Sequence, residues 1–208
     1  MKREERREQS LECFAKKYDL DYEVTYTELI GDSPELRDEI HVYVASYMEE
    51  GESAVIYSYE QDEKVITEDN LFGYIIRAEY EDTILQVVNT YFDDAKVYST
   101  FASSSFDASL GKNKTLQDAY DLGEKMLANI SVIVRTDADE TAFKKSMDEI
   151  SEILKSKKRF GMIHGYAVTD ASEYEDINRM NFQRKVNVFA EHANVKMPYN
   201  VYNTKSYK

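Results

Sequence analysis

The chain has 208 residues, 42% of them apolar, and its 40 acidic and 26 basic residues give a formal net charge of −14. That length and apolar content suffice for one large or two small folded domains. With only 2 prolines and 7 glycines, the composition excludes collagen-like, loop-rich and low-complexity chains, and the lone Cys13 excludes an internal disulfide scaffold.

No segment approaches the roughly 20 consecutive apolar residues of a membrane-spanning helix. The first residues, MKREERREQ, are charged and lack the apolar core of a signal peptide. We therefore expect a soluble chain without a transmembrane segment.

The first hundred residues predict a helix, a set of antiparallel strands, a second helix and a further strand. Leu11, Phe14 and Tyr18 share one face of a helix over 3–18. Alternation of apolar and polar residues, or richness in β-forming residues, then predicts strands at 22–27, 40–47, 54–59 and 64–67. The helical period returns from 78 to about 93, and 97–101 predicts another strand.

The second half predicts alternating helices and strands. Residues 102–114 are polar and aperiodic, which is typical of a linker or a long loop. Three helix starts follow, marked by Thr115 with Asp118, by Asp137 with Glu140, and by Asp170 with Glu173. Apolar runs at 130–134 and 161–168 predict strands between these helices.

These elements predict an α+β fold with two small antiparallel or mixed sheets, each covered by helices, or one continuous sheet. We expect an acidic α+β domain at 1–101, a linker or loop at 102–114, and a second α+β domain at 115–208.

The charge is unevenly distributed along the chain. Residues 1–100 hold 25 acidic and 10 basic residues, whereas 101–208 hold 15 and 16. Between residues 18 and 94 there are 21 acidic residues and three basic ones. Such a segment repels phosphate backbones and anionic lipids, so we expect no direct nucleic-acid binding. The same acidic surface could instead imitate a nucleic acid and occupy a protein that binds one.

Catalytic and metal-binding motifs are missing from the sequence. His41, His164 and His192 each stand alone, and neither a zinc motif, an EF-hand nor a phosphate-binding loop is present. Asp19 with Asp21 is the kind of oxygen-rich pair that can hold a cation, as are the acidic residues at 137–140, but helix capping already explains the latter. We therefore predict no catalytic, cofactor-binding or metal site and no cofactor.

The 17 tyrosines are the second unusual feature. Tyr43, Tyr47, Tyr57 and Tyr59 fall in β-rich runs, where aromatic side chains suit cross-strand pairing on a half-exposed sheet. Tyrosine also supplies binding area at low entropic cost, so these four are our candidate partner-binding residues.

Three successive runs carry a resemblance to a known group of proteins: LECFAKKYDLDYEVTYTEL, EIHVYVASYMEEGESAVIYSY and EDNLFGYIIRAEYEDTILQVVNTYFDDAKVYSTF. Over about 8–101 this order resembles small uncharacterised extracytoplasmic, lipoprotein-like proteins of Gram-positive bacteria. The chain departs from their pattern at Asp19 and at 70–72, and it lacks their signal peptide and lipobox. The resemblance implies an extracytoplasmic compartment; because the group has no established activity, it indicates no active-site residues. The alternative compartment is the cytoplasm.

The functional hypothesis from these patterns is a non-enzymatic interaction module. Its acidic, tyrosine-bearing sheet face would engage a protein or cell-envelope partner. Two alternatives stay open: an acidic inhibitor that mimics nucleic acid, and an enzyme whose site combines distant carboxylates with one histidine. The sequence leaves the partner and the oligomeric state open.

Overall fold

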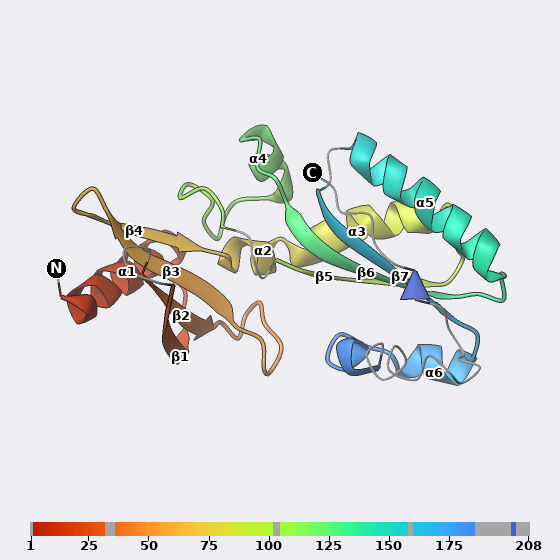
Figure 1. Cartoon of the computed structure of the whole chain (residues 1–208), viewed down its shortest axis with the longest axis horizontal. Coiled ribbons are helices and arrows are strands. Elements are labelled where there is room, and N and C mark those ends of the chain that lie inside the picture. Colours follow the sequence, from red (N-terminus) through yellow and green to blue (C-terminus); the bar gives the residue numbers. More distant parts are fainter. Residues whose placement is uncertain (1, 32–35, 102–104, 158–159, 186–200, 203–208) are drawn as a thin grey trace. The chain divides into compact units, whose positions relative to one another are not determined.

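The computed structural model describes residues 2–31, 36–101, 105–157, 160–185 and 201–202 (Figure 1). Its first half contains the elements α1 (Arg3–Tyr18), β1 (Glu23–Ile30), β2 (Arg37–Tyr43), β3 (Ala54–Gln61), β4 (Lys64–Asp69), α2 (Leu71–Ile75), α3 (Arg77–Val88) and β5 (Ala95–Thr100). The second half contains α4 (Leu116–Asp121), β6 (Leu127–Arg135), α5 (Glu140–Ser156), β7 (Phe160–Val168), α6 (Ala171–Asp176) and β8 (Val201–Tyr202). Among the described residues, no helix combines the length and apolar character needed to cross a membrane.

The strands of the described residues form two separate sheets, so the predicted α+β class is confirmed and the alternative of one continuous sheet is wrong. The first sheet has the order β1-β2-β3-β4 and is antiparallel throughout. The second has the order β5-β6-β7-β8, in which β6 and β7 run parallel and the other pairs antiparallel.

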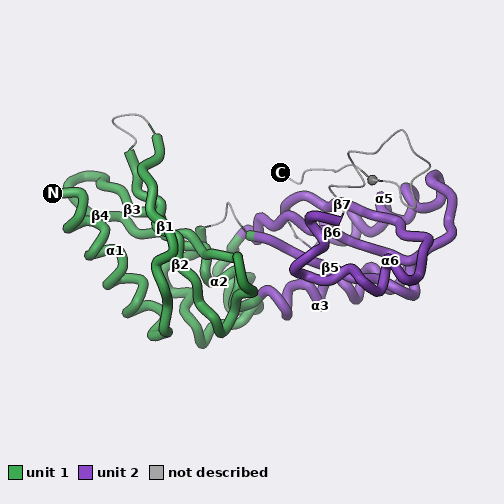
Figure 2. The backbone as a smooth tube through the Cα atoms, turned by 90° about the horizontal axis from the view of Figure 1, so that it is seen from below, with its two compact units in different colours: residues 1–76, 101–124 green, residues 77–100, 125–208 purple. Residues whose placement is uncertain are grey.

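Two compact units contain one sheet each, and both are built from two stretches of chain (Figure 2). Unit 1 comprises residues 1–76 and 101–124, and unit 2 comprises 77–100 and 125–208. These bounds differ from the predicted domains 1–101 and 115–208. The predicted helix at 78–93 and the strand that follows it belong to unit 2, and the segment expected as a linker is part of unit 1.

In unit 1, helix α1 packs on one face of the first sheet, which we call the inner face. Phe14 and Tyr18 are fully buried against Ile40, Val42 and Ile56. Ser10 of the same helix face bonds to the hydroxyl of Ser58 at 2.7 Å. The helix predicted at 3–18 is therefore confirmed, with its apolar stripe against the sheet.

The inner face also contains a buried ionic cluster. Asp38 has no exposed side-chain surface, and its carboxylate accepts hydrogen bonds from Arg3, Arg6 and Arg7 of α1 at 2.5–2.8 Å. Burial opposes ionisation of Asp38, but the three guanidinium groups outweigh it and hold the pKa of this carboxyl below its usual value. This cluster fixes the start of α1 on β2.

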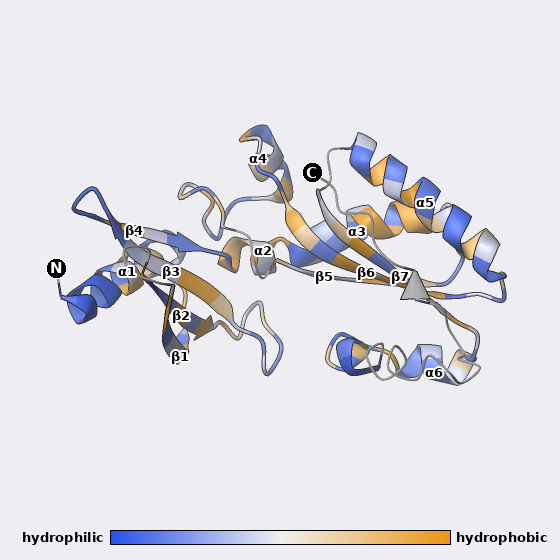
Figure 3. Ribbon diagram, viewed as in Figure 1, coloured by the Kyte–Doolittle hydropathy of each residue, from blue (hydrophilic) through white to orange (hydrophobic). Residues whose placement is uncertain are grey.

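In unit 2, α3 and α5 cover one face of the second sheet and α6 covers the other (Figure 1). Figure 3 shows that α5 alternates between apolar and polar residues, as expected for a helix with one face on a sheet. Phe143, Met147, Ile150 and Leu154 of α5 are buried, as the spacing predicted.

Local capping explains where the helices of the second half begin. Thr115 and Asp118 form the predicted capping box, and the Asp170 side chain accepts from the Glu173 amide as predicted. The start of α5 differs from the prediction because Asp139, rather than Asp137, is its N-cap. The helix that begins after Thr115 is short and ends at Asp121, and β6 begins at Leu127, three residues before the strand predicted at 130–134.

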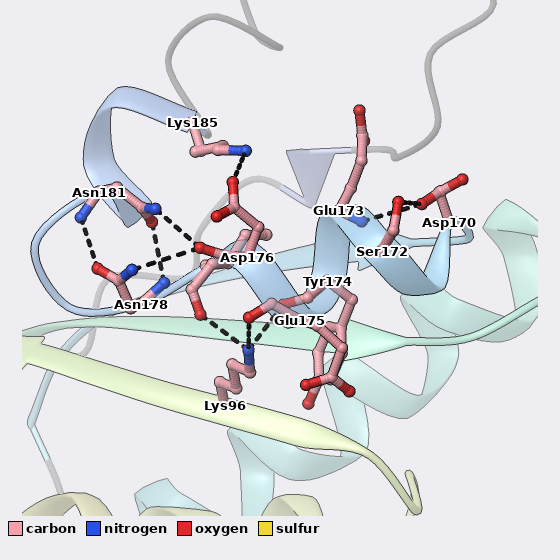
Figure 4. Close-up of polar contacts among 11 residues, drawn as sticks. Lys96, Asp170, Ser172, Glu173, Tyr174, Glu175, Asp176, Asn178, Asn181 and Lys185 are labelled. Carbon is pink, nitrogen blue, oxygen red and sulfur yellow. Dashed lines mark hydrogen bonds and ion pairs between the residues drawn. The ribbon is translucent and has the colours of Figure 1, made fainter.

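Lys96 of β5 holds α6 on the second sheet (Figure 4). Its ammonium donates to the carbonyls of Tyr174 and Ile177 at 2.7 and 2.8 Å, and to that of Glu175 at 3.3 Å. A cation at the C-terminal end of a helix satisfies carbonyls that have no partner in the helix. Asp176 pairs with Lys185, which ties the segment after α6 to the same helix.

Candidate functional site

The outer face of the first sheet, opposite α1, is the candidate site. Side chains alternate across each strand, so Ile40 and Val42 of β2 point toward α1 whereas Glu39 and His41 point outward. Register extends this face to β3 and β4, because Glu39 lies opposite Tyr57, which in turn lies opposite Glu68. We use the term outer face for this set: Glu23, Tyr26, Glu28, Ile30, Arg37, Glu39, His41, Tyr43, Val55, Tyr57, Tyr59, Lys64, Ile66 and Glu68.

An irregularity in β1 brings Glu28 to this face. Val24 lies opposite Val42 and Tyr26 lies opposite His41, so Thr25 is an extra residue in β1. A bulge of this kind shifts the following side chains to the other face. Tyr26 and Glu28 therefore point outward, whereas the uninterrupted alternation predicted for 22–27 placed Val24 and Tyr26 on the same face.

Glu28, Glu39 and His41 form a cluster on three neighbouring positions of the outer face. The Nε2 atom of His41 lies 4.0 Å from Oε1 of Glu28 and 4.0 Å from Oε2 of Glu39. One ligand atom from each residue lies within 4.8 Å of the others. The side chains are 39%, 13% and 24% exposed, respectively, so the cluster lies at the surface rather than inside a closed cavity.

Beside this cluster, two tyrosines pack with charged groups. The Arg37 guanidinium lies 4.7 Å from the ring centre of Tyr57, in a cation–π contact. The Tyr59 hydroxyl donates to Glu68 at 3.2 Å. Burial, followed by the neighbouring glutamates, raises the pKa of both tyrosines, that of Tyr57 through Glu39 and that of Tyr59 through Glu68.

An open pocket of about 530 Å³ lies at the edge of the outer face. Its lining combines apolar, aromatic and acidic groups with one basic side chain, Arg37, whose guanidinium contacts Glu39 and Tyr57: Ile30, Gly31, Leu36, Arg37, Tyr59, Glu60, Gln61 and Glu68. Its two carboxylates and one tyrosine ring are groups that attract a cationic side chain.

The structure divides the four tyrosines predicted to bind a partner. Tyr57 and Tyr59 lie next to one another on the outer face of β3. Tyr43 lies at the end of β2 on the outer face, and Tyr47 lies in the turn after β2; both are half-buried and pack against the core of unit 1. Tyr26, which was not among the candidates, is 56% exposed on the same face.

Part of the acidic segment 19–94 is neutralised within the molecule. Five of its acidic residues pair with bases from outside the segment: Asp19 with Lys112, Asp38 with Arg3, Arg6 and Arg7, Asp69 with Lys17, Glu81 with Arg179, and Asp94 with Arg135. Asp38 and Asp69 are also buried. Of these five, Asp38 and Asp69 lie on the inner face of the first sheet, Asp19 lies at the end of α1, and Glu81 and Asp94 belong to unit 2. This distribution does not favour the single row of carboxylates that a nucleic-acid mimic requires.

The net charge nevertheless belongs to one unit. Unit 1 contains 24 acidic and 10 basic residues, whereas unit 2 contains 16 of each. The formal charge of −14 is therefore the charge of unit 1, and unit 2 is neutral.

The other candidates from the sequence are not joined into a site. His164 lines a pocket of about 340 Å³ without an acidic residue, and burial lowers its pKa. His192 lies outside the described residues. Cys13 is exposed on α1. Asp19 is bound to Lys112, and the acidic residues at 137–140 lie at the start of α5, where Asp139 caps the helix.

The Glu28–Glu39–His41 cluster was missed by motif reasoning because it spans two strands. His41 lies on the strand predicted at 40–47 and Glu39 directly precedes it; the strand found begins at Arg37, which places the two side chains on one face. Glu28 joins them only through the register of the hairpin and the extra residue Thr25.

Comparisons with known proteins add little. No protein-family model matches the chain, and no curated protein matches it. Among solved structures, the chain is similar to a DUF5037 family protein from Ruminococcus gnavus, with 10% sequence identity and a TM-score of 0.42. The match covers 96% of this chain and 92% of that one. A likeness this weak carries no argument about function.

Proposed function

We propose that the protein is a non-enzymatic binding module whose unit 1 takes up a basic segment of a protein partner on the outer face. The observation that carries this proposal is the confinement of the net charge of −14 to the unit with the open, tyrosine-bearing sheet face. Among the possible occupants, charge complementarity selects a Lys- or Arg-rich segment.

The pocket beside Tyr59 supplies the local contact. Glu60 and Glu68 provide negative charge, and the Tyr59 ring provides an aromatic surface for a cation. The contact of Arg37 with Tyr57 is an example within this chain of a guanidinium held by the same face. We expect one basic side chain of the partner to enter this pocket.

The field of unit 1 acts over a longer range. Surface charges attract across about 8–10 Å at physiological ionic strength and are screened beyond that distance. Association should therefore be fast and should weaken as salt is raised, while the tyrosine contacts add affinity that salt affects less. The extracytoplasmic location expected from the sequence resemblance stays a prediction.

A labelled peptide of alternating lysine and threonine tests the proposal, with fluorescence anisotropy on the whole chain as the measurement. Glu68→Gln removes one charge from the outer face. Glu50→Gln removes the same charge from the exposed turn after β2 and is the matched control. We expect Glu68→Gln to weaken binding roughly fivefold, the effect of about 1 kcal/mol, and Glu50→Gln to weaken it less than twofold.

The tyrosine contribution needs a second comparison. Tyr59→Ala should weaken peptide binding at least as much as Glu68→Gln, and Tyr59→Phe, which keeps the ring, should have a smaller effect. Equal losses for Glu68→Gln and Glu50→Gln would mean that only the overall charge attracts the peptide. The absence of binding at low salt would overturn the proposal altogether.

A further inference from the structure

Each side chain of the Glu28–Glu39–His41 cluster is held by a neighbour through the atom that does not face the cluster. His41 contacts the Ser53 hydroxyl through Nδ1 at 3.2 Å, which leaves Nε2 directed at the two glutamates. Glu39 meets Arg37 through Oε1 at 3.3 Å, while its Oε2 faces His41. The Tyr26 hydroxyl lies 3.4 Å from Oε2 of Glu28, whose Oε1 faces His41.

The centre of this cluster is polar but without a hydrogen bond. Nε2 of His41 is buried at the atomic level and has no hydrogen-bond partner. Its 4.0 Å separations from Glu28 and Glu39 exceed the range of a hydrogen bond. They are slightly longer than the roughly 3.3–3.6 Å that separates two ligand atoms of a tetrahedral zinc ion with bonds of about 2.0–2.2 Å. Two carboxylates that face one imidazole nitrogen across such a gap form a typical donor set for a divalent ion.

We propose that Glu28, Glu39 and His41 bind one first-row divalent metal ion, with zinc as the representative. One nitrogen and two carboxylate oxygens suit zinc and its neighbours, whereas calcium and magnesium take oxygen donors. Three protein ligands leave a further coordination position open to water.

The second layer of contacts supports the assignment. Metal-binding histidines commonly hydrogen-bond through their other ring nitrogen, which fixes the ring orientation. The Ser53 hydroxyl makes this contact with Nδ1 of His41, and Arg37 donates a hydrogen bond to the oxygen of Glu39 that does not face the cluster. Tetrahedral coordination requires ligand atoms about 3.3–3.6 Å apart, so the carboxylates have to move inward by a fraction of an ångström. Glu28 is the most exposed of the three and can make this movement.

The experiment uses the chelator-treated whole chain, with zinc in calorimetry and cobalt(II) in visible absorption. We expect one ion per chain and a cobalt spectrum typical of nitrogen and oxygen ligands. His41→Gln and Glu39→Gln should each weaken zinc binding at least about 100-fold. Ser53→Ala, which removes only the contact with Nδ1, should weaken it about 10- to 100-fold.

Two controls make the result decisive. His164→Gln removes a histidine of unit 2 and should leave the affinity for zinc unchanged. Circular dichroism of the metal-free variants checks that each one is folded. Unchanged affinity in His41→Gln would place the ion elsewhere on this acidic chain and overturn the proposal. Failure of the unaltered chain to bind zinc at micromolar concentrations would overturn it equally.

Discussion

Glu81 of α3 accepts hydrogen bonds from both the amide and the hydroxyl of Ser99 on β5, at 2.6 and 3.0 Å. Its other oxygen pairs with Arg179, from the segment after α6. One buried carboxylate thus joins a helix and a strand to a segment about a hundred residues away, all within unit 2. Five acidic residues of the segment 19–94 have such basic partners within the molecule, whereas Glu28, Glu39 and Glu68 lie on the outer face of unit 1.

Replacing Glu81 tests its role as a link. Glu81→Gln keeps an acceptor for Ser99 but loses the ion pair with Arg179, and we expect unit 2 to lose about 1–3 kcal/mol of its free energy of unfolding. Urea unfolding measures this value. In a background of Arg179→Met the same substitution should cost clearly less, because the pair is already broken. An additive double variant would contradict the coupling.

The Asp38 cluster should dominate the stability of unit 1. Asp38→Asn leaves three arginines without their common carboxylate. We expect it to lower the free energy of unfolding, measured in urea, by about 2–4 kcal/mol. This is less than for a fully buried ion pair because the arginines are partly exposed. Glu12→Gln, on the exposed side of α1, is the control and should have little effect.

Because the pKa of Asp38 is lowered in the folded protein, the stability that this carboxylate contributes depends on pH. A carboxyl with a lower pKa in the folded state stabilises the fold above its unfolded pKa, about 3.9, and loses that effect as pH falls through the folded value. The difference in stability between the unaltered chain and Asp38→Asn should therefore shrink below about pH 4. A difference that stays constant down to pH 2 would contradict this assignment.

Lys96 should control how firmly α6 is attached. Lys96→Met keeps the aliphatic stem but removes the ammonium that binds three carbonyls, so amides around 171–177 should exchange with solvent at least about tenfold faster. Hydrogen-exchange mass spectrometry measures the rate. Lys145→Met, on the exposed side of α5, should leave exchange in α6 unchanged. Equal exchange rates for the amides around 171–177 in both variants would show that Lys96 does not hold α6 on the sheet.

Tyr174 should make the stability of unit 2 fall at alkaline pH. Burial, followed by Asp94 and Glu175, raises the pKa of Tyr174 to about 12. Because the unfolded tyrosine ionises near pH 10, the stabilisation is complete below that pH and is lost as pH rises toward 12. Absorbance at 295 nm should show one late-titrating tyrosine fewer in Tyr174→Phe than in the unaltered chain, while Tyr18, whose pKa burial and Asp69 also raise, should titrate late in both. Titration of every tyrosine near pH 10 would be the contrary result.

The sequence was most informative where short-range chemistry decides the structure. The apolar spacing from Phe143 to Leu154 predicted α5, and the cap residues Thr115 and Asp170 predicted helix starts correctly. The cap of α5 was misassigned because Asp137 and Asp139 both lie before the helix, and only backbone geometry selects the second.

Contacts between distant segments could not be predicted in the same way. The pairing of Asp38 with three arginines and the meeting of Glu28 with His41 depend on how α1 docks and on the strand register of β1. The two units are each assembled from two stretches of chain, so charge counted along the sequence located the acidic half only approximately. When the charges are counted by unit, the whole net charge of −14 belongs to unit 1.

The most direct test of the binding account is a two-dimensional NMR titration of the whole chain, labelled with nitrogen-15, with the alternating lysine–threonine peptide. The account predicts that the largest shifts occur at outer-face positions of β2, β3 and β4, including Arg37, Tyr59 and Glu68, and that unit 2 shifts little. Shifts concentrated along the exposed acidic side of α1, or spread evenly over both units, would contradict it.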